Sequence, residues 1–217
     1  MAMVLYGTSG SPFVRKVQVV LAEKGIPYEH EAVVPFNVSP EYRQISPLGK
    51  IPALKHDGRA LADSSVICAY LERLHPEPQL YPADPYEYAR ALWFEEYGDS
   101  ALVGVVGPKI FFKKFVAPRF FNQPTNEAEV QKSIDEELPP LFDYLESQLG
   151  DDPFLAGKAF SIGDIGIATE FVNLRHVGVG VDTRRWPKLT RWVAGIHERP
   201  SFRKVIEEER AAFGLTA

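Results

Sequence analysis

Cysteine is nearly absent from this sequence, which has only Cys68 among its 217 residues. A single cysteine excludes a disulfide within the chain and a zinc site built from cysteine pairs. The five histidines do not follow the i, i+4 spacing that places two metal ligands on one helix face. We therefore expect no metal ion, and we expect Cys68 to be a small buried side chain.

Long hydrophobic runs and an excess of basic residues are also missing. No apolar run reaches the roughly 18 residues that span a bilayer. Residues 1–6 lack the basic and apolar segments of a signal peptide. The net charge of −5 gives the chain no general attraction to nucleic acid phosphates. We therefore expect a cytoplasmic protein that binds neither membranes nor nucleic acids.

The hydrophobic pattern of the first 75 residues predicts alternating strands and helices. Asp57-Gly58 lies between two apolar runs and predicts a tight hairpin turn. Strands are expected at residues 3–7, 28–34, 51–55 and from 60 onward, and helices at 12–24 and 65–74. With one short helix in the loop 35–50, the order is β-α-β-(α)-β-β-α.

The pattern changes at a proline-rich connector, residues 76–86. Beyond it the sequence shows long helical periodicities and almost no strand signal, with a bend expected near residues 104–108. Ser161 and Asp164 form a capping box before an apolar run. We predict an α/β first domain over residues 1–80 and an all-helical second domain over 86–217.

Four short segments carry a family resemblance. They are residues 11–17 (SPFVRKV), 47–54 (PLGKIPAL), 61–67 (LADSSVI) and 160–165 (FSIGDI). In this order and spacing they resemble the cytosolic glutathione transferase family, and the Ser-Pro-Phe start resembles its serine-type members of the tau-like and bacterial subgroups. The resemblance implies a thioredoxin-like first domain, a helical-bundle second domain, a homodimer, and reduced glutathione as co-substrate.

The family's chemistry is activation of the glutathione thiol. A thiol with a pKa of about 8.5 is mostly protonated at neutral pH, although the thiolate is the nucleophile. Ser11 precedes Pro12, and proline is favoured at the first helical position. The Ser11 hydroxyl is thus expected at the positive end of the helix, where it would favour the thiolate. Ser11 is the candidate catalytic residue, with Ser9 and Tyr6 as alternatives; a role confined to capping is the structural alternative.

The resemblance also implies the residues that bind glutathione. Ile51-Pro52 is expected to form a cis peptide bond that presents the Ile51 backbone to the cysteinyl unit, although an ordinary trans bond is the structural alternative. Asp63 would pair with the amino group. Ser64 is expected to cap the third helix and to hold a carboxylate. Lys50 is placed to meet the glycyl carboxylate, unless it is a solvated loop residue.

The second domain supplies candidates for the pocket that binds the other substrate. Tyr97, Phe111 and Phe112 belong to an aromatic-rich stretch that can line an apolar pocket, or can instead form the bundle core or a subunit interface. The expected activity is transfer of glutathione to small hydrophobic electrophiles. The alternatives are a non-catalytic glutathione-binding carrier or regulatory protein, and a glutathione-dependent isomerase or reductase.

Overall fold

The computed structural model describes residues 3–36 and 38–215 of the chain. They divide into two units. The first contains the described residues up to Leu80 and those from Pro200 onward, and the second is Tyr81–Arg199. The sequence assigns residues 86–217 to the second domain, whereas the structure groups the last helix, α11 (Pro200–Phe213), with the first unit. The reason is that α11 packs against the first helix of the chain.

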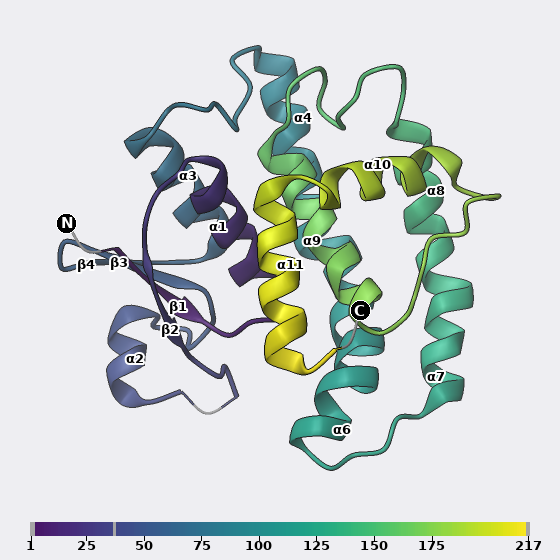
Figure 1. Ribbon diagram of the computed structural model, residues 1–217, viewed down its shortest axis with the longest axis horizontal. Helices are drawn as coiled ribbons and strands as arrows, with labels where there is room; N and C mark the ends of the chain where they lie inside the picture. The colour runs from purple at the N-terminus through teal and green to yellow at the C-terminus, as the bar shows by residue number, and fades with distance from the viewer. Residues whose placement is uncertain (1–2, 37, 216–217) are drawn as a thin grey trace. The chain divides into compact units, whose positions relative to one another are not determined.

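A four-stranded mixed sheet forms the centre of the first unit (Figure 1). Its strands are β1 (Met3–Gly7), β2 (Glu29–Ala32), β3 (Ala53–His56) and β4 (Arg59–Ala62), in the order β2-β1-β3-β4. The first strand is parallel to β2, across a helical crossover, and antiparallel to β3. The predicted hairpin at Asp57-Gly58 is confirmed, since both residues have positive φ and join β3 to β4.

Three helices of this unit are α1 (Pro12–Glu23), α2 (Pro40–Ile45) and α3 (Ser64–Leu74). The α1 and α3 helices pack together on one face of the sheet, and α2 lies on the other (Figure 1). Side chains alternate between the faces, so the paired residues Tyr6 and Ala53 pack toward α2 with Tyr42. The neighbouring pair Leu5 and Leu54 faces α1 and α3. The thioredoxin-like fold expected for this part of the chain is confirmed.

The second unit consists of helices, as predicted. One continuous run contains α4 (Pro85–Glu96), η1 (Tyr97–Leu102), α5 (Val103–Val105), η2 (Val106–Val116) and α6 (Ala117–Phe120). A second contains α7 (Glu127–Lys132), η3 (Ser133–Glu137) and α8 (Leu138–Gln148), and the unit ends with α9 (Ile162–His176) and α10 (Pro187–His197). The η segments are π-helical. At the place where the sequence predicts a bend, the helix has the wide turns of the π-helical segment η2, which contains Pro108.

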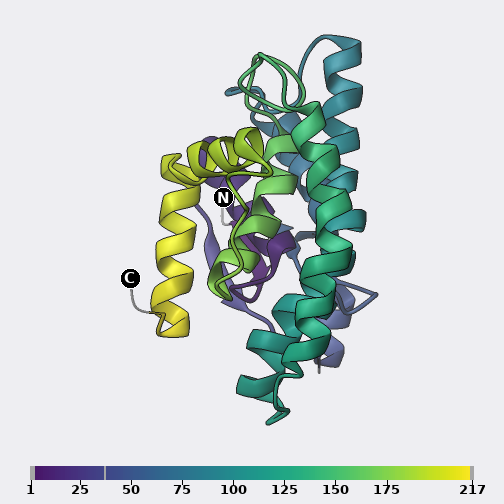
Figure 2. The ribbon, with the colours of Figure 1, turned by 90° about the vertical axis from the view of Figure 1, so that its right-hand side faces the viewer.

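The centre of the second unit is α9, whose residues from Ile162 to Leu174 are all buried. Gly163 allows close packing against α4, because a Cβ there would lie 2.8 Å from the Ala91 carbonyl oxygen. Figure 2 shows the long helices of this unit side by side. The predicted capping box at Ser161 and Asp164 is confirmed.

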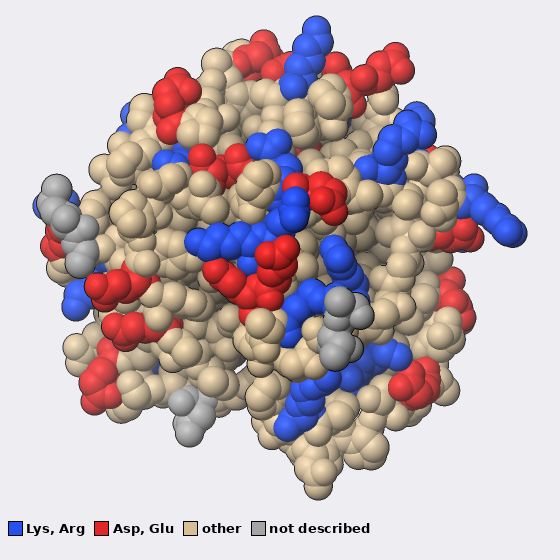
Figure 3. All heavy atoms as spheres, in the orientation of Figure 1, with Lys and Arg blue, Asp and Glu red and all other residues tan. Residues whose placement is uncertain are grey.

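Charged side chains of both signs are intermixed on the face shown in Figure 3. Among the described helices, none has the length and hydrophobicity needed to cross a bilayer. Within residues 3–36 and 38–215, no three His, Cys, Asp or Glu side chains gather as a metal-binding group.

Candidate active site

Register in the sheet brings the three predicted motifs of the first unit to one edge. Tyr6 pairs with Ala53, and Ala53 pairs with Ala62. The chain therefore leaves β1, enters β3 and leaves β4 along one line across the sheet. Each of the three motifs lies directly beyond this line: the turn 8–11, the Ile51-Pro52 bond, and Asp63-Ser64 at the start of α3.

Ser11 ends the turn that follows β1 and begins α1. Its backbone is extended, and its Oγ accepts a hydrogen bond from the Val14 amide at 3.4 Å. Pro12 follows in the first helical turn. The prediction that Ser11 caps this helix is thus confirmed. Since the hydroxyl oxygen acts as an acceptor here, its proton can be donated to a ligand at the positive end of α1.

The two alternatives to Ser11 occupy different environments. Ser9 lies half-buried in the same turn, one residue before Gly10. Tyr6 is a buried core residue with its ring centroid 6.1 Å from that of Tyr42. Burial, with the nearby charges of Glu31 and Glu29, raises the pKa of the Tyr6 phenol above its usual value of 10.0. Tyr6 is therefore a neutral side chain packed within the sheet layer.

The Ile51-Pro52 peptide bond is cis, as the sequence predicts. Pro52 is buried, Ile51 half-buried and Lys50 exposed. The carbonyl oxygen of Lys50 accepts two hydrogen bonds, one from Tyr42 Oη at 2.9 Å and one from Ser46 Oγ at 2.8 Å. These bonds fix the peptide that precedes the cis bond. Ile51 precedes Ala53, the first paired residue of β3, so the Ile51 backbone lies outside the hydrogen-bonded ladder of the sheet.

Asp63, rather than the predicted Ser64, is the N-cap of α3. Its Oδ1 accepts hydrogen bonds from the Ser65 amide at 2.9 Å and the Val66 amide at 3.2 Å. Its backbone has φ of 80° and ψ of 132°, a conformation that few residues other than glycine adopt. Ser64 is instead the first residue of the helix and is buried.

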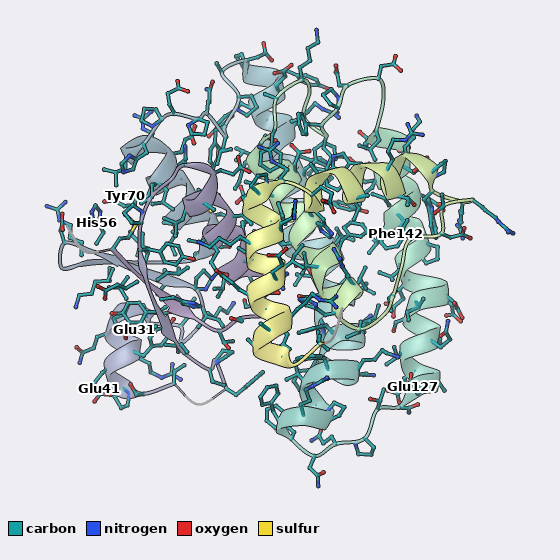
Figure 4. The ribbon with its side chains drawn as sticks, in the orientation of Figure 1. Glu31, Glu41, His56, Tyr70, Glu127 and Phe142 are labelled. Carbon is teal, nitrogen blue, oxygen red and sulfur yellow. The ribbon has the colours of Figure 1, made fainter. Side chains whose placement is uncertain are left out.

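The first turn of α3 carries a nearby positive charge. Lys16, fully buried on α1, donates from Nζ to Ser65 Oγ at 3.0 Å. The ammonium adds to the positive end of the α3 helix, so an anionic group would be stabilised there. Farther along α3, Tyr70 points toward His56 at the end of β3 (Figure 4), with 2.7 Å between its hydroxyl and His56 Nδ1. This bond ties the helix to the hairpin.

The three aromatic residues predicted for the substrate pocket lie in the second unit. Phe111 is buried and stacks on Phe115, with ring centroids 5.0 Å apart. Phe112 is half-buried and packs against Phe121. The Tyr97 ring lies 4.9 Å from that of Tyr144, and burial raises the pKa of its phenol to about 12. A cavity of about 380 Å³ in this unit is lined by other residues, from α9, α10 and the loop between them.

Four residues around the site have no role in the sequence analysis: Lys16, Tyr42, Ser46 and Glu209. Lys16 and Arg15 interrupt the apolar pattern of α1, yet the structure buries every residue from Val14 to Leu21. Glu209, on α11, binds Arg15 and the Gly10 amide, about 200 positions earlier in the chain. The signal in the sequence for a special role at this place is the pair Arg15-Lys16, two consecutive basic residues inside an otherwise apolar helix.

Comparisons with known proteins agree with this arrangement. Residues 5–79 match the family model of the glutathione S-transferase N-terminal domain, and residues 110–200 match that of the C-terminal domain. Glutathione S-transferase U4 of Arabidopsis thaliana is 31% identical, over 93% of this chain and 87% of the relative. Glutathione S-transferase U8 of the same plant is 35% identical, over 87% and 81%.

A solved structure of a glutathione S-transferase has the same fold as this chain. Glutathione S-transferase-I bound with the ligand lactoylglutathione is 26% identical to this chain, with a TM-score of 0.83. The match covers 95% of this chain and 99% of that structure.

Proposed function

This chain belongs to the glutathione S-transferase family, and we propose that it transfers reduced glutathione to small hydrophobic electrophiles. The observation that carries the proposal is the edge of the sheet where the Ser11 hydroxyl, the cis Ile51-Pro52 bond and the start of α3 follow one line of paired residues. A hydroxyl donor, an unpaired backbone segment and a positive helix end suit a thiol, a peptide and a carboxylate, respectively.

In this proposal the edge binds glutathione as an extended tripeptide. The backbone of Ile51 pairs with the cysteinyl unit, because it lies outside the strand ladder. The Ser64 amide and hydroxyl hold the γ-glutamyl carboxylate, supported by the charge of Lys16, which reaches from α1 to Ser65 in the first turn of α3. The exposed Asp63 carboxylate binds the amino group, and the exposed Lys50 side chain meets the glycyl carboxylate.

The chemical step proposed for this site is attack by the glutathione thiolate. The Ser11 hydroxyl donates a hydrogen bond to the sulfur, and the positive end of α1 adds to its effect, so the thiol pKa falls. The thiol proton passes to solvent. The sulfur then forms a bond to an electrophilic carbon. In an addition the π bond at that carbon breaks, its electron pair moves to the neighbouring atom, and solvent supplies a proton. In a substitution the leaving group departs with the electron pair of its own bond. Ser11 keeps its own proton throughout.

The electrophile is proposed to bind apolar side chains of the second unit. Tyr97 and Phe112 are half-buried and therefore remain candidates for contact with a substrate. Phe111 packs within the bundle against Phe115, so a direct role for it requires a change in packing. A cytoplasmic location and a homodimer complete the proposal.

Titration calorimetry with reduced glutathione, followed by a panel of electrophiles assayed with and without glutathione, tests the function. We expect binding below millimolar concentration, conjugation of at least one apolar electrophile, and much weaker binding by Ser64→Ala. Absence of binding at millimolar glutathione would contradict the proposal. Binding without turnover would identify a carrier or regulatory protein instead, and turnover confined to isomerisation or reduction would identify one of those enzyme types.

A further inference from the structure

The turn that carries both candidate serines has a defined type. The Ser11 amide donates to the Thr8 carbonyl at 3.4 Å, so Ser9 and Gly10 are the two central residues. Gly10 has φ of 86°, and Ser9 has a negative φ. A negative φ at the second residue of the turn, Ser9, and a positive φ at the third, Gly10, are the pattern of a type II turn. Types I and II differ by a flip of the central peptide, here the bond between Ser9 and Gly10.

The central peptide is held by a residue of the last helix. Glu209, on α11, accepts a hydrogen bond at Oε1 from the Gly10 amide at 3.2 Å. The same carboxylate binds Arg15, with 3.0 Å from Nε to Oε1 and 2.7 Å from Nη2 to Oε2. Arg15 is 0% exposed and Glu209 1% exposed, so the whole arrangement is sealed from water.

We propose that Glu209 is a positioning residue for thiol activation, acting through the Gly10 amide to hold the turn 8–11 in its type II form. This inference rests on the proposed function. Arg15 would be neutralised by any carboxylate at this place, whereas the bond to Gly10 selects one orientation of the peptide between Ser9 and Gly10. If the peptide flipped, its carbonyl oxygen would face the carboxylate of Glu209, and the repulsion between them would displace the turn that carries both serine hydroxyls.

The position of the turn 8–11 sets the distance between the serine hydroxyl and the glutathione sulfur. A hydroxyl lowers the thiol pKa only when it lies within bonding distance of the sulfur, and a displacement of about 1 Å can reduce a rate by roughly a hundredfold. The helix α11 therefore does more than cover α1. It fixes the serine-bearing turn from a position 199 residues along the chain.

Two double variants separate the bond to Gly10 from the ion pair. Removing one buried charge alone would leave its partner uncompensated, so both charges are removed together. Arg15→Met with Glu209→Gln keeps an oxygen that can accept from the Gly10 amide. Arg15→Met with Glu209→Met has almost the same shape and replaces that oxygen by a thioether sulfur, a much weaker acceptor. Neither carries a charge at these positions, so electrostatic effects on the thiol are matched.

The measurements are the amide resonance of Gly10 without ligand, and the pKa of the bound glutathione thiol, from thiolate absorbance against pH. We expect the Met/Met variant to shift the Gly10 resonance, to raise the thiol pKa relative to the Met/Gln variant, and to have a kcat about tenfold lower, with KM for glutathione changed much less. Chemical denaturation of both variants shows whether they are folded to the same extent.

Each outcome has one meaning. Equal Gly10 resonances in the two variants would overturn the anchoring of the turn, and equal thiol pKa values would overturn its role in activation. A wild-type protein that binds no glutathione would refute the proposed function, and the positioning role with it. A wild-type protein that turns over while the two variants match would refute the positioning role alone.

Discussion

The phenolic hydroxyl of Tyr42 donates a hydrogen bond to the backbone carbonyl of Lys50, with 2.9 Å between the two oxygen atoms. Ser46 donates a second bond to the same carbonyl at 2.8 Å. Both donors come from the short helix α2 and the residue that ends it. They hold the residue that precedes the cis Ile51-Pro52 bond, so α2 sets the position of the backbone proposed to bind glutathione.

Tyr42→Phe and Ser46→Ala should each weaken glutathione binding by about two- to tenfold, since a hydrogen bond contributes about 0.5–1.5 kcal/mol. We expect kcat at saturating glutathione to change little, because neither residue contacts the turn with Ser11 in this proposal. Calorimetry measures the affinity, and Tyr86→Phe, which alters a 70% exposed tyrosine, is the control. Unchanged affinity in the Tyr42→Phe, Ser46→Ala double variant would contradict the role of these bonds.

Asp63 combines a helix cap with an unfavourable backbone conformation. Asp63→Asn keeps a good capping residue, so the free energy of unfolding should stay within about 0.5 kcal/mol of the wild type. Asp63→Gly loses the cap but relieves backbone strain of about 1–3 kcal/mol, so its stability should also change little. Both remove the carboxylate, and glutathione affinity should fall at least tenfold. If Asp63→Asn binds glutathione like the wild type, Asp63 is only a cap.

Asp164 gives the second unit a pH-dependent stability. Its carboxylate accepts bonds from the Ser161 and Leu155 amides, yet burial raises its pKa from 3.8 to about 6. The folded state binds the proton of Asp164 more tightly than the unfolded state does. This tighter binding adds to the free energy of unfolding in full below pH 4, and the added stability is lost as pH rises through 6.

The variant Asp164→Asn should therefore be destabilised more at pH 4 than at pH 7, by up to about 3 kcal/mol. Urea unfolding of both proteins at the two pH values measures the difference. Equal destabilisation at both would show that the carboxylate is ionised in the folded protein throughout this range.

The chain is proposed to form a two-fold dimer. Large apolar side chains are exposed in the second unit, among them Phe120 at 67% on α6 and Trp93 at 51% on α4, and contact with a second copy would bury such surface. Light scattering at micromolar concentration should give about twice the chain mass of 24.3 kDa. A mass equal to one chain would contradict the dimer.

Local signals in the sequence were enough to predict most of the fold and part of the site. Ser11 before Pro12 marks a helix start, and Asp57-Gly58 marks a hairpin, because each depends on neighbouring residues alone. The sequence predicts Ser64 rather than Asp63 as the cap of α3, since both residue types are good caps and the positive φ of Asp63 leaves no trace in the sequence. The role of Glu209 cannot be predicted from neighbouring residues, because its partners, Gly10 and Arg15, are distant in the chain.

The central claim is that the Ser11 hydroxyl activates the glutathione thiol, and the pH dependence of the conjugation rate tests it most directly. Ser11→Ala should raise the apparent thiol pKa and lower the rate by about ten- to a hundredfold, since a hydrogen bond to a charged acceptor is worth about 1.5–3 kcal/mol. Ser11→Thr, which keeps a hydroxyl and a cap, should retain more of the rate, and glutathione affinity should persist in both. If Ser9→Ala alone raises the thiol pKa, the role belongs to Ser9. If neither alanine variant raises it, the claim is wrong.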